Sequence, residues 1–185
     1  MSRISILLSL LTIGAACNWA DKKPFCMFPE LFPVSMKASD KQVDVQQYMG
    51  TWYEIATWPN RYQKDCICND EIYEGNKDDG YFWMSGRCTK KSGEIHFGGK
   101  GKLYPRNDKN TRMRLYFSLM IPGNYYILDI DPDYQWAVLA EPCGDMAFVI
   151  GRTKTLGHDV LGGCFAVLQA NGFDTTKMKM RDPSC

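Results

Sequence analysis

Cysteine and histidine are the residue types in this 185-residue chain that could support metal or nucleophilic chemistry. Cys66 and Cys68 are close enough in sequence to begin a metal site, but a tetrahedral zinc site needs about four ligands. The remaining cysteines are dispersed singly, and the two histidines, His96 and His158, are far apart. No Gly-x-Ser-x-Gly turn is present to hold a nucleophilic serine. We therefore expect no metal, no cofactor and no catalytic residues.

The first residues have the order of a secretory signal peptide. A single arginine precedes a short apolar run over residues 4–13, and small residues follow it. Such a run is too short to span a bilayer as a mature helix. We predict a signal peptide over residues 1–20, cleaved after Ala16 or Ala20, and a mature domain over residues 21–185. The protein is then secreted, or lumenal or periplasmic.

A lipid anchor on Cys17 is the alternative to release. In bacterial lipoproteins the first cysteine after the cleavage site carries the lipid, and Cys17 follows the small residues at 14–16. A lipoprotein signal usually has leucine three places before that cysteine, and this chain has Gly14 there. Release after cleavage is therefore the favoured expectation.

The cysteine count of this exported chain is typical of a disulfide framework, because disulfides persist in oxidising compartments. The eight cysteines are Cys17, Cys26, Cys66, Cys68, Cys88, Cys143, Cys164 and Cys185.

From residue 50 the chain consists of short runs of aromatic and β-branched residues, separated by Gly, Pro, Asn or Asp. Such runs are typical of strands, and such breaks of tight turns. Connections this short favour antiparallel neighbours. We predict an eight-stranded antiparallel up-and-down barrel over residues 50–152, which leaves no unpaired edge; a β-sandwich is the alternative. The predicted strands are Gly50–Trp58, Cys68–Gly75, Tyr81–Thr89, Glu94–Leu103, Arg112–Leu119, Tyr125–Ile130, Gln135–Glu141 and Ala147–Arg152.

One helix follows the last predicted strand. Over residues 159–170 the apolar side chains fall on one broad face, and Asn171-Gly172 is a natural stop. Gly162 and Gly163 each weaken a helix by about 1 kcal/mol relative to alanine, which a close approach to a sheet would make tolerable. We expect an all-β fold with this one C-terminal helix packed on the barrel wall.

Three motifs resemble the signatures of the lipocalin family. Gly50-Thr51-Trp52 opens the first predicted strand, Asp131-Pro132-Asp133-Tyr134 lies between two late strands, and Gly151-Arg152-Thr153 ends the last strand. The resemblance covers roughly residues 26–185, and its motifs stand in the family's order. Within the family the chain is most similar to the group of apolipoprotein D, the bacterial outer-membrane lipocalins and the chloroplast lipocalins.

The resemblance implies a structural plug at one end of the barrel. There the ring of Trp52 lies against the guanidinium group of Arg152, a contact worth about 0.5–2 kcal/mol depending on desolvation. Burial of a large aromatic residue is ordinarily core packing. We therefore expect this pair to stabilise the fold rather than to contact a ligand.

The resemblance also implies a cup that holds an apolar molecule. Side chains alternate along a strand, so Glu54, Ala56 and Trp58 share a face with Trp52. Other positions match family residues that face the cup. Glu54 or the Tyr73 hydroxyl could orient a polar head group; the alternative for each residue is that it simply fills the barrel. The candidate ligand-binding residues are Glu54, Trp58, Tyr73, Leu115, Phe117, Ala137 and Leu139.

Three function classes follow from the resemblance and the surface. A carrier of a fatty acid, lysolipid, sterol or pigment is favoured over a lipocalin-like enzyme, because no histidine is paired with cysteine or serine. A third class is an interaction protein, whose apolar rim segments 58–65 and 120–122 meet a receptor, a protease or a membrane surface. The formal net charge is +1 and the basic residues are scattered, so no nucleic acid partner is expected.

The resemblance finally implies a disulfide pattern. It pairs Cys26 with Cys143, and it brings Cys185 to the start of the second strand, where two cysteines compete. By alternation Cys66 and Cys68 point to the same face of that strand. The hairpin that follows brings Cys88 opposite them. We prefer Cys68–Cys185 with Cys66–Cys88 and keep the exchanged pairing as the alternative. Cys164 is then a buried thiol or is tied to Cys17.

Overall fold

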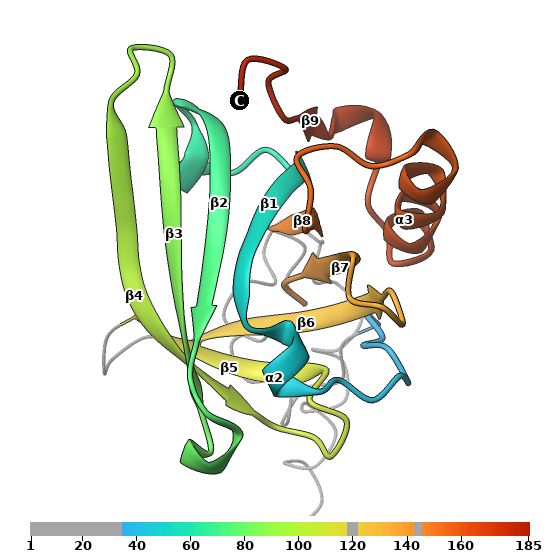
Figure 1. Ribbon diagram of the computed structural model, residues 1–185. Helices are drawn as coiled ribbons and strands as arrows, with labels where there is room; N and C mark the ends of the chain where they lie inside the picture. Colours follow the sequence, from blue (N-terminus) through green and yellow to red (C-terminus); the bar gives the residue numbers. More distant parts are fainter. Residues whose placement is uncertain (1–34, 118–121, 143–145) are drawn as a thin grey trace, which may run out of the picture.

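The computed structural model describes residues 35–117, 122–142 and 146–185. Within them, eight antiparallel strands close into the predicted up-and-down barrel (Figure 1). Neighbouring strands follow chain order from β2 to β8, and β1 closes the barrel by pairing with both β8 and β2. The strands are β1 (Gly50–Thr57), β2 (Cys66–Glu74), β3 (Phe82–Lys90), β4 (Ile95–Pro105), β5 (Arg112–Tyr116), β6 (Pro122–Ile130), β7 (Trp136–Ala140) and β8 (Ala147–Gly151).

The hairpin between β5 and β6 is where the strand boundaries depart most from the prediction. β5 ends at Tyr116 rather than Leu119, and β6 begins at Pro122 rather than Tyr125. Pro122 pairs with Tyr116 at the start of its strand. Proline is tolerated at that position, although its missing N–H makes it read as a turn signal in the sequence.

The predicted helix is present as α3 (His158–Ala170) and lies on the outside of the barrel, against β6, β7 and β8 (Figure 1). Its Cys164 and Leu168 are buried among outward-facing side chains of the wall, such as Val138 and Val149. Burial of this one helical stripe seals the outer face of three strands. The helix packed on the barrel wall is thus confirmed.

Gly162 and Gly163 do not lie against the sheet, so the close approach that would make them tolerable does not occur at these positions. Both are exposed, and no atom lies within 4 Å of the place where a Cβ would be. Their side of the helix faces solvent. The structure therefore gives no packing reason for glycine at either position.

A short helix, α2 (Val45–Tyr48), lies just before β1 at one end of the barrel (Figure 1). The Asp44 side chain caps it by accepting a 2.8 Å hydrogen bond from the Gln46 backbone N–H. Tyr48 is fully buried and packs beneath the barrel interior. This helix closes the end of the barrel at which β1 begins.

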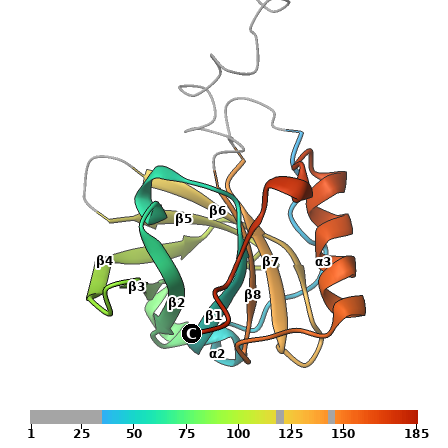
Figure 2. The same cartoon turned by 90° about the horizontal axis from the view of Figure 1, so that it is seen from above.

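The C-terminal segment crosses the barrel wall beside β1 (Figure 2). Its strand β9 (Lys179–Met180) pairs with the second half of β1, at Ala56 and Thr57. The ladder between β1 and β2 stops at Tyr53, so β9 replaces β2 as the neighbour of β1 beyond that point. Single 3-10 turns complete the described elements: η2 (Arg61–Gln63), η3 (Lys77–Asp79) and η4 (Thr175–Lys177).

In the part of the chain that the structure describes, no helix has the length and apolar character needed to cross a membrane.

Candidate functional site

The barrel interior is one cluster of buried side chains to which all eight barrel strands and α2 contribute. Only the inside of a closed barrel brings side chains from every strand together. The cluster is largely aliphatic and aromatic, with tyrosine hydroxyls among its polar groups. Its largest fully buried members are Trp52, Tyr48, Tyr73, Phe82, Leu103, Met113, Ile127, Leu139 and Ile150.

Four of the predicted cup residues lie inside the barrel. Tyr73, Leu115, Ala137 and Leu139 all belong to the interior cluster and are at most 8% exposed. Glu54 is also inside, because it pairs with the inward-facing Ile150 of β8 and is 4% exposed. The structure therefore brings these five side chains together from β1, β2, β5 and β7.

Phe117 lies at the edge of the interior and is 55% exposed. It stands beside Leu115, and both side chains reach over the glycine-rich part of β4. A Cβ on Gly101 would lie 2.7 Å from Leu115 Cδ1 and 3.0 Å from Phe117 Cδ1. Glycine at 101 thus leaves the room that these two side chains occupy.

Trp58 is not inside the barrel, which corrects the prediction from alternation. Its ring packs edge-on against Phe173 with centroids 5.3 Å apart, in the cluster between the barrel wall and α3. The cause is an irregularity in β1. Glu54 pairs with Ile150 and Ala56 with Val149, so Ile55 is one extra residue. A bulge of this kind inverts the alternation for the residues that follow.

A chain of hydrogen bonds runs through the interior from α2 to β2. The hydroxyl groups of Tyr48 and Tyr125 are 2.7 Å apart, and those of Tyr125 and Tyr73 are 2.6 Å apart. The Tyr73 hydroxyl in turn donates to Oε2 of Glu71. Of these four residues, only Tyr73 was a candidate site residue from the sequence. The alternation of side chains along β2 places Glu71 on the same face as Tyr73. Nothing in the sequence links Tyr48 to these hydrogen bonds.

Glu54 and Glu71 are two buried carboxyl groups on adjacent strands of the interior. Glu71 pairs with Trp52, two residues before Glu54 on β1. Glu54 accepts hydrogen bonds from Thr57 Oγ1 at 2.7 Å and from Gln63 Nε2 at 2.6 Å. Burial raises the pKa of Glu54 to about 7; burial and the nearby charge of Glu54 raise the pKa of Glu71 to about 8.

A pocket of about 170 Å³ adjoins Glu54 where β1 and β2 separate. The C-terminal segment forms one side of it, because β9 has taken the place of β2 beside β1. Its lining combines polar side chains with the apolar residues Pro59, Cys66, Ile67 and Met180. The lining residues are Glu54, Thr57, Pro59, Asn60, Gln63, Lys64, Cys66, Ile67, Asn69, Lys179, Met180 and Arg181.

The Trp52–Arg152 contact lies at the end of the barrel closed by α2. The Arg152 guanidinium carbon is 3.9 Å from the centroid of the Trp52 ring. The same guanidinium donates to the backbone carbonyls of Thr51, Gln47 and Met49 at 2.7–2.9 Å. Trp52 Nε1 donates to the Tyr48 carbonyl at 2.8 Å. Arg152 therefore ties the end of β8 to the start of β1.

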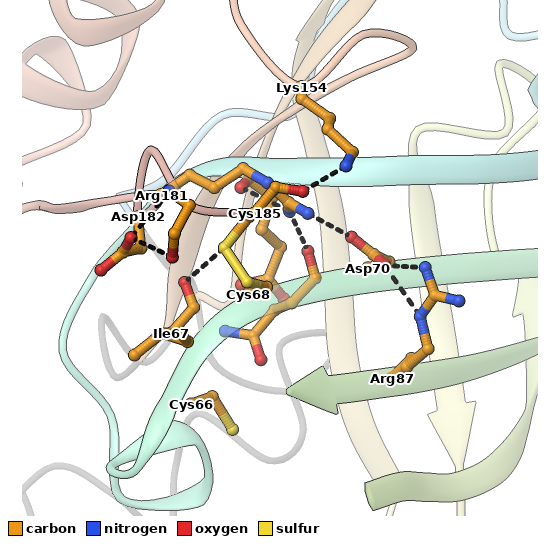
Figure 3. Close-up of a disulfide and its surroundings, with 12 residues drawn as sticks. Cys66, Ile67, Cys68, Asp70, Arg87, Lys154, Arg181, Asp182 and Cys185 are labelled. Atoms are coloured by element: carbon orange, nitrogen blue, oxygen red, sulfur yellow. Dashed lines mark hydrogen bonds and ion pairs between the residues drawn. A yellow bond between two sulfur atoms is a disulfide. The ribbon is translucent and has the colours of Figure 1, made fainter. Parts of the chain in front are cut away.

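Two disulfides are present among the described residues: Cys66–Cys88 and Cys68–Cys185. Figure 3 shows the second of them. Their Cα–Cα distances are 5.4 Å and 5.7 Å. This is the pairing preferred from the resemblance, not the exchanged one. The second disulfide ties the last residue of the chain to β2.

The remaining cysteine predictions are tested only in part. Cys17, Cys26 and Cys143 lie outside the described residues, so the Cys26–Cys143 pair stays a prediction. Cys164 has a free thiol in the described structure, and it is buried on the face of α3 that packs against the barrel wall. Burial raises the pKa of this thiol to about 12.

Ion pairs hold the C-terminal segment close to the Cys68–Cys185 disulfide (Figure 3). The Arg181 guanidinium lies 3.0 Å from Asp70 Oδ1 and donates to the Asn69 carbonyl at 2.8 Å. Arg87 of β3 pairs with the other oxygen of Asp70. Within the described residues, no cluster of three or more potential metal ligands accompanies these groups.

Comparison with known proteins gives the class to which this barrel belongs. The chain matches the family description "Lipocalin-like domain" over residues 43–183. It is 29% identical to temperature-induced lipocalin-1 of Arabidopsis thaliana over 145 residues, covering 75% of this chain and 78% of the relative. It is also 29% identical to the outer membrane lipoprotein Blc of Escherichia coli over 136 residues, covering 72% and 76%.

Solved structures agree on the fold. Apocrustacyanin A1 from lobster superposes with a TM-score of 0.61 at 22% identity, covering 82% of this chain and 92% of that protein. The eight-stranded barrel, the helix on its wall and the family match over residues 43–183 together define the class. The chain belongs to the lipocalin family.

Proposed function

We propose that this protein carries a small apolar molecule inside its barrel. The observation that carries the proposal is the composition of the interior cluster, in which aliphatic and aromatic side chains from every strand surround a few polar groups. Small-molecule sites are typically apolar with few, well-placed polar anchors. Members of the lipocalin family bind small hydrophobic ligands such as lipids and pigments, which supports the same function.

The arrangement of the interior suggests how a ligand would lie. Its apolar part would contact Leu115, Phe117 and Leu139, while Glu54 and Tyr73 supply the polar groups. Phe117 is half-exposed and stands beside glycines of β4, at the edge of the interior where a ligand would enter. Trp52 and Arg152, which close the opposite end, would remain structural.

A carrier fits the chemistry of the described residues better than an enzyme does. Cys164, the free thiol, lies on α3, between this helix and the outer face of the barrel. Its thiol has a raised pKa and is therefore a poor nucleophile. We propose that the protein is exported after removal of the predicted signal peptide. Its disulfides support this proposal, because such bonds persist in oxidising compartments.

We propose a peripheral membrane contact through the loop between β1 and β2. Tyr62 of this loop is 69% exposed. Exposed aromatic residues near a barrel rim are suited to the interface between water and lipid. The other predicted rim segment, residues 120–122, lies mostly outside the described residues. Sedimentation with vesicles would test this contact, with Tyr62→Ser expected to weaken it.

Ligand binding can be tested on the purified mature protein with a panel of fatty acids, lysolipids, sterols, retinoids and carotenoids. At least one class is expected to change the tryptophan fluorescence saturably, with one molecule bound per chain. Extraction of the protein from its native host followed by mass spectrometry would identify the physiological compound. Absence of saturable binding across the whole panel would contradict the proposal.

A further inference from the structure

Two carboxyl groups inside the barrel have no cationic partner. Among the described residues, neither Glu54 nor Glu71 forms an ion pair with a lysine or an arginine. Besides their hydrogen bond to each other, the groups that hydrogen-bond to them are neutral: Thr57, Gln63, Asn69 and Tyr73. Buried carboxylates ordinarily have an opposite charge beside them or give up their own charge. Binding of a purely apolar ligand would not require two carboxyl groups inside the barrel, so Glu54 and Glu71 indicate a further role.

The cations around this pair bind other groups or extend into solvent. Arg181 of the C-terminal segment pairs with Asp70, and the Lys179 ammonium group donates to the Cys66 carbonyl. Arg152 at the closed end donates to backbone carbonyls. Lys64, which lines the pocket beside Glu54, has an exposed side chain. The charge of Asp70 adds to the negative potential at Glu54.

The other titratable groups that face the pair are tyrosines. Tyr73 of β2 contacts Glu71, Tyr125 of β6 contacts Tyr73, and Tyr48 of α2 contacts Tyr125. Burial raises the pKa values of all three hydroxyls, so they stay neutral across the physiological range. Glu54 and Glu71 are therefore the groups whose ionisation changes the charge of the described interior.

We propose that Glu54 and Glu71 set the charge selectivity of the barrel, which admits neutral and cationic polar groups and excludes anionic ones. This inference rests on the proposed function and names the class of ligand. A carboxylate or phosphate that entered the cup would meet negative charge without water to screen it, and such repulsion is strong at low local dielectric. An ammonium group could pair with the carboxyl groups of Glu54 and Glu71, because no lysine or arginine among the described residues already does so.

Ionisation of the pair links this selectivity to pH. Below the pKa values of both groups the interior is neutral, and the penalty for an anion is small. As the pH rises past them, the interior becomes negative and the penalty grows. An anion that binds at neutral pH must therefore take up protons, and a cation must release them.

The test compares three probes with the same ten-carbon chain: decanol, decanoate and decylamine. Each keeps its own charge between about pH 6 and about pH 8.5, so a change in relative affinity reports on the protein. Calorimetry at both pH values gives the affinities. At the higher pH we expect decanoate to bind at least about tenfold more weakly than decanol, and decylamine at least as tightly. The gap between decanoate and decanol should narrow at the lower pH.

The variant Glu54→Gln, Glu71→Gln keeps the size and hydrogen-bonding capacity of both side chains and removes their charge. It should bind decanoate and decanol with the same relative affinity at both pH values. Glu74→Gln is the matched control, because Glu74 is on the same strand but exposed. This control should retain the parent's selectivity.

Proton counts on the parent protein provide a readout that does not depend on any variant folding. Binding enthalpies measured at neutral pH in buffers of different ionisation enthalpy should show proton uptake with decanoate and proton release with decylamine. Equal binding of decanoate and decanol at the higher pH, with no protons exchanged, would overturn the selectivity while leaving the carrier function in place. Failure of all three probes to bind would also overturn the selectivity as stated, whereas the carrier function would fall only if the whole ligand panel failed to bind as well.

Discussion

At the scale of single residues, Trp52 and Arg152 show how a structural contact can be read from a signature. The guanidinium of Arg152 covers the ring of Trp52 at 3.9 Å and binds three backbone carbonyls. Arg152 therefore acts through both charge and packing, whereas Trp52 acts through its buried volume. The two residues should differ in the size of their effect on stability.

Replacing Trp52 by alanine should lower the free energy of unfolding by about 3–5 kcal/mol, as for other large buried side chains. Arg152→Ala should lower it by less, about 1–3 kcal/mol, because the group is partly exposed. Urea denaturation followed by circular dichroism measures both values. A Trp52→Ala protein as stable as the parent would show that the end of the barrel is closed in another way.

The carboxyl pair makes stability depend on pH. The pKa values of Glu54 and Glu71 are raised above the ordinary value of 4.5, so the folded state binds more protons than the unfolded chain between these limits. The contribution of this pair to the free energy of unfolding is then full at low pH and is lost as the pH rises through the two pKa values. We expect the melting temperature to fall between about pH 5 and about pH 8. The slope should flatten in the Glu54→Gln, Glu71→Gln protein and persist in Glu74→Gln.

At the scale of elements, a glycine of α3 and a glycine of β4 should respond in opposite ways to replacement by alanine. Gly162 lies on the solvent side of α3 with open space around it. Gly162→Ala should stabilise the protein by about 0.5–1 kcal/mol, because alanine is the better helix former. Gly101→Ala should destabilise it, because the new methyl group meets Leu115 and Phe117. Thermal melts test both directions: the melting temperature should rise in Gly162→Ala and fall in Gly101→Ala.

The strands show which elements a sequence can reveal. β-branched and aromatic runs between turn residues placed all eight barrel strands, because both signals are local. The extra residue Ile55 was not visible, because a bulge depends on the register of β1 against β8. For that reason Trp58 was placed on the wrong face, while Glu54, which precedes the bulge, was placed correctly. The exposed position of Gly162 was missed for a similar reason, since it depends on which face of α3 meets the wall.

At the scale of the whole molecule, the C-terminal segment holds together parts that are distant in sequence. β9 pairs with β1, Arg181 reaches Asp70, and Cys185 joins Cys68 across 117 residues of chain (Figure 3). The tether to β2 was predictable from the resemblance. The pairing of β9 with β1 was not, because a two-residue strand has no recognisable pattern.

Removing the tether should therefore destabilise the fold without changing its class. Cys68→Ser with Cys185→Ser should lower the free energy of unfolding by about 2–4 kcal/mol in the loop-entropy description of disulfides. Guanidinium denaturation of the non-reduced proteins gives the difference. The far-ultraviolet circular dichroism should stay that of a β-barrel. An unchanged free energy of unfolding would show that the ion pairs alone hold the segment.

The central claim is that a ligand occupies the inside of the barrel, and one affinity comparison tests it most directly. Leu115 and Tyr116 are consecutive on β5, with Leu115 in the interior cluster and Tyr116 outside it. Leu115→Trp should fill the cup and weaken binding of the best ligand from the panel by more than about tenfold, whereas Tyr116→Trp should leave its affinity unchanged. Both proteins must melt cooperatively for the comparison. Equal affinities in Leu115→Trp and the parent would contradict an interior site.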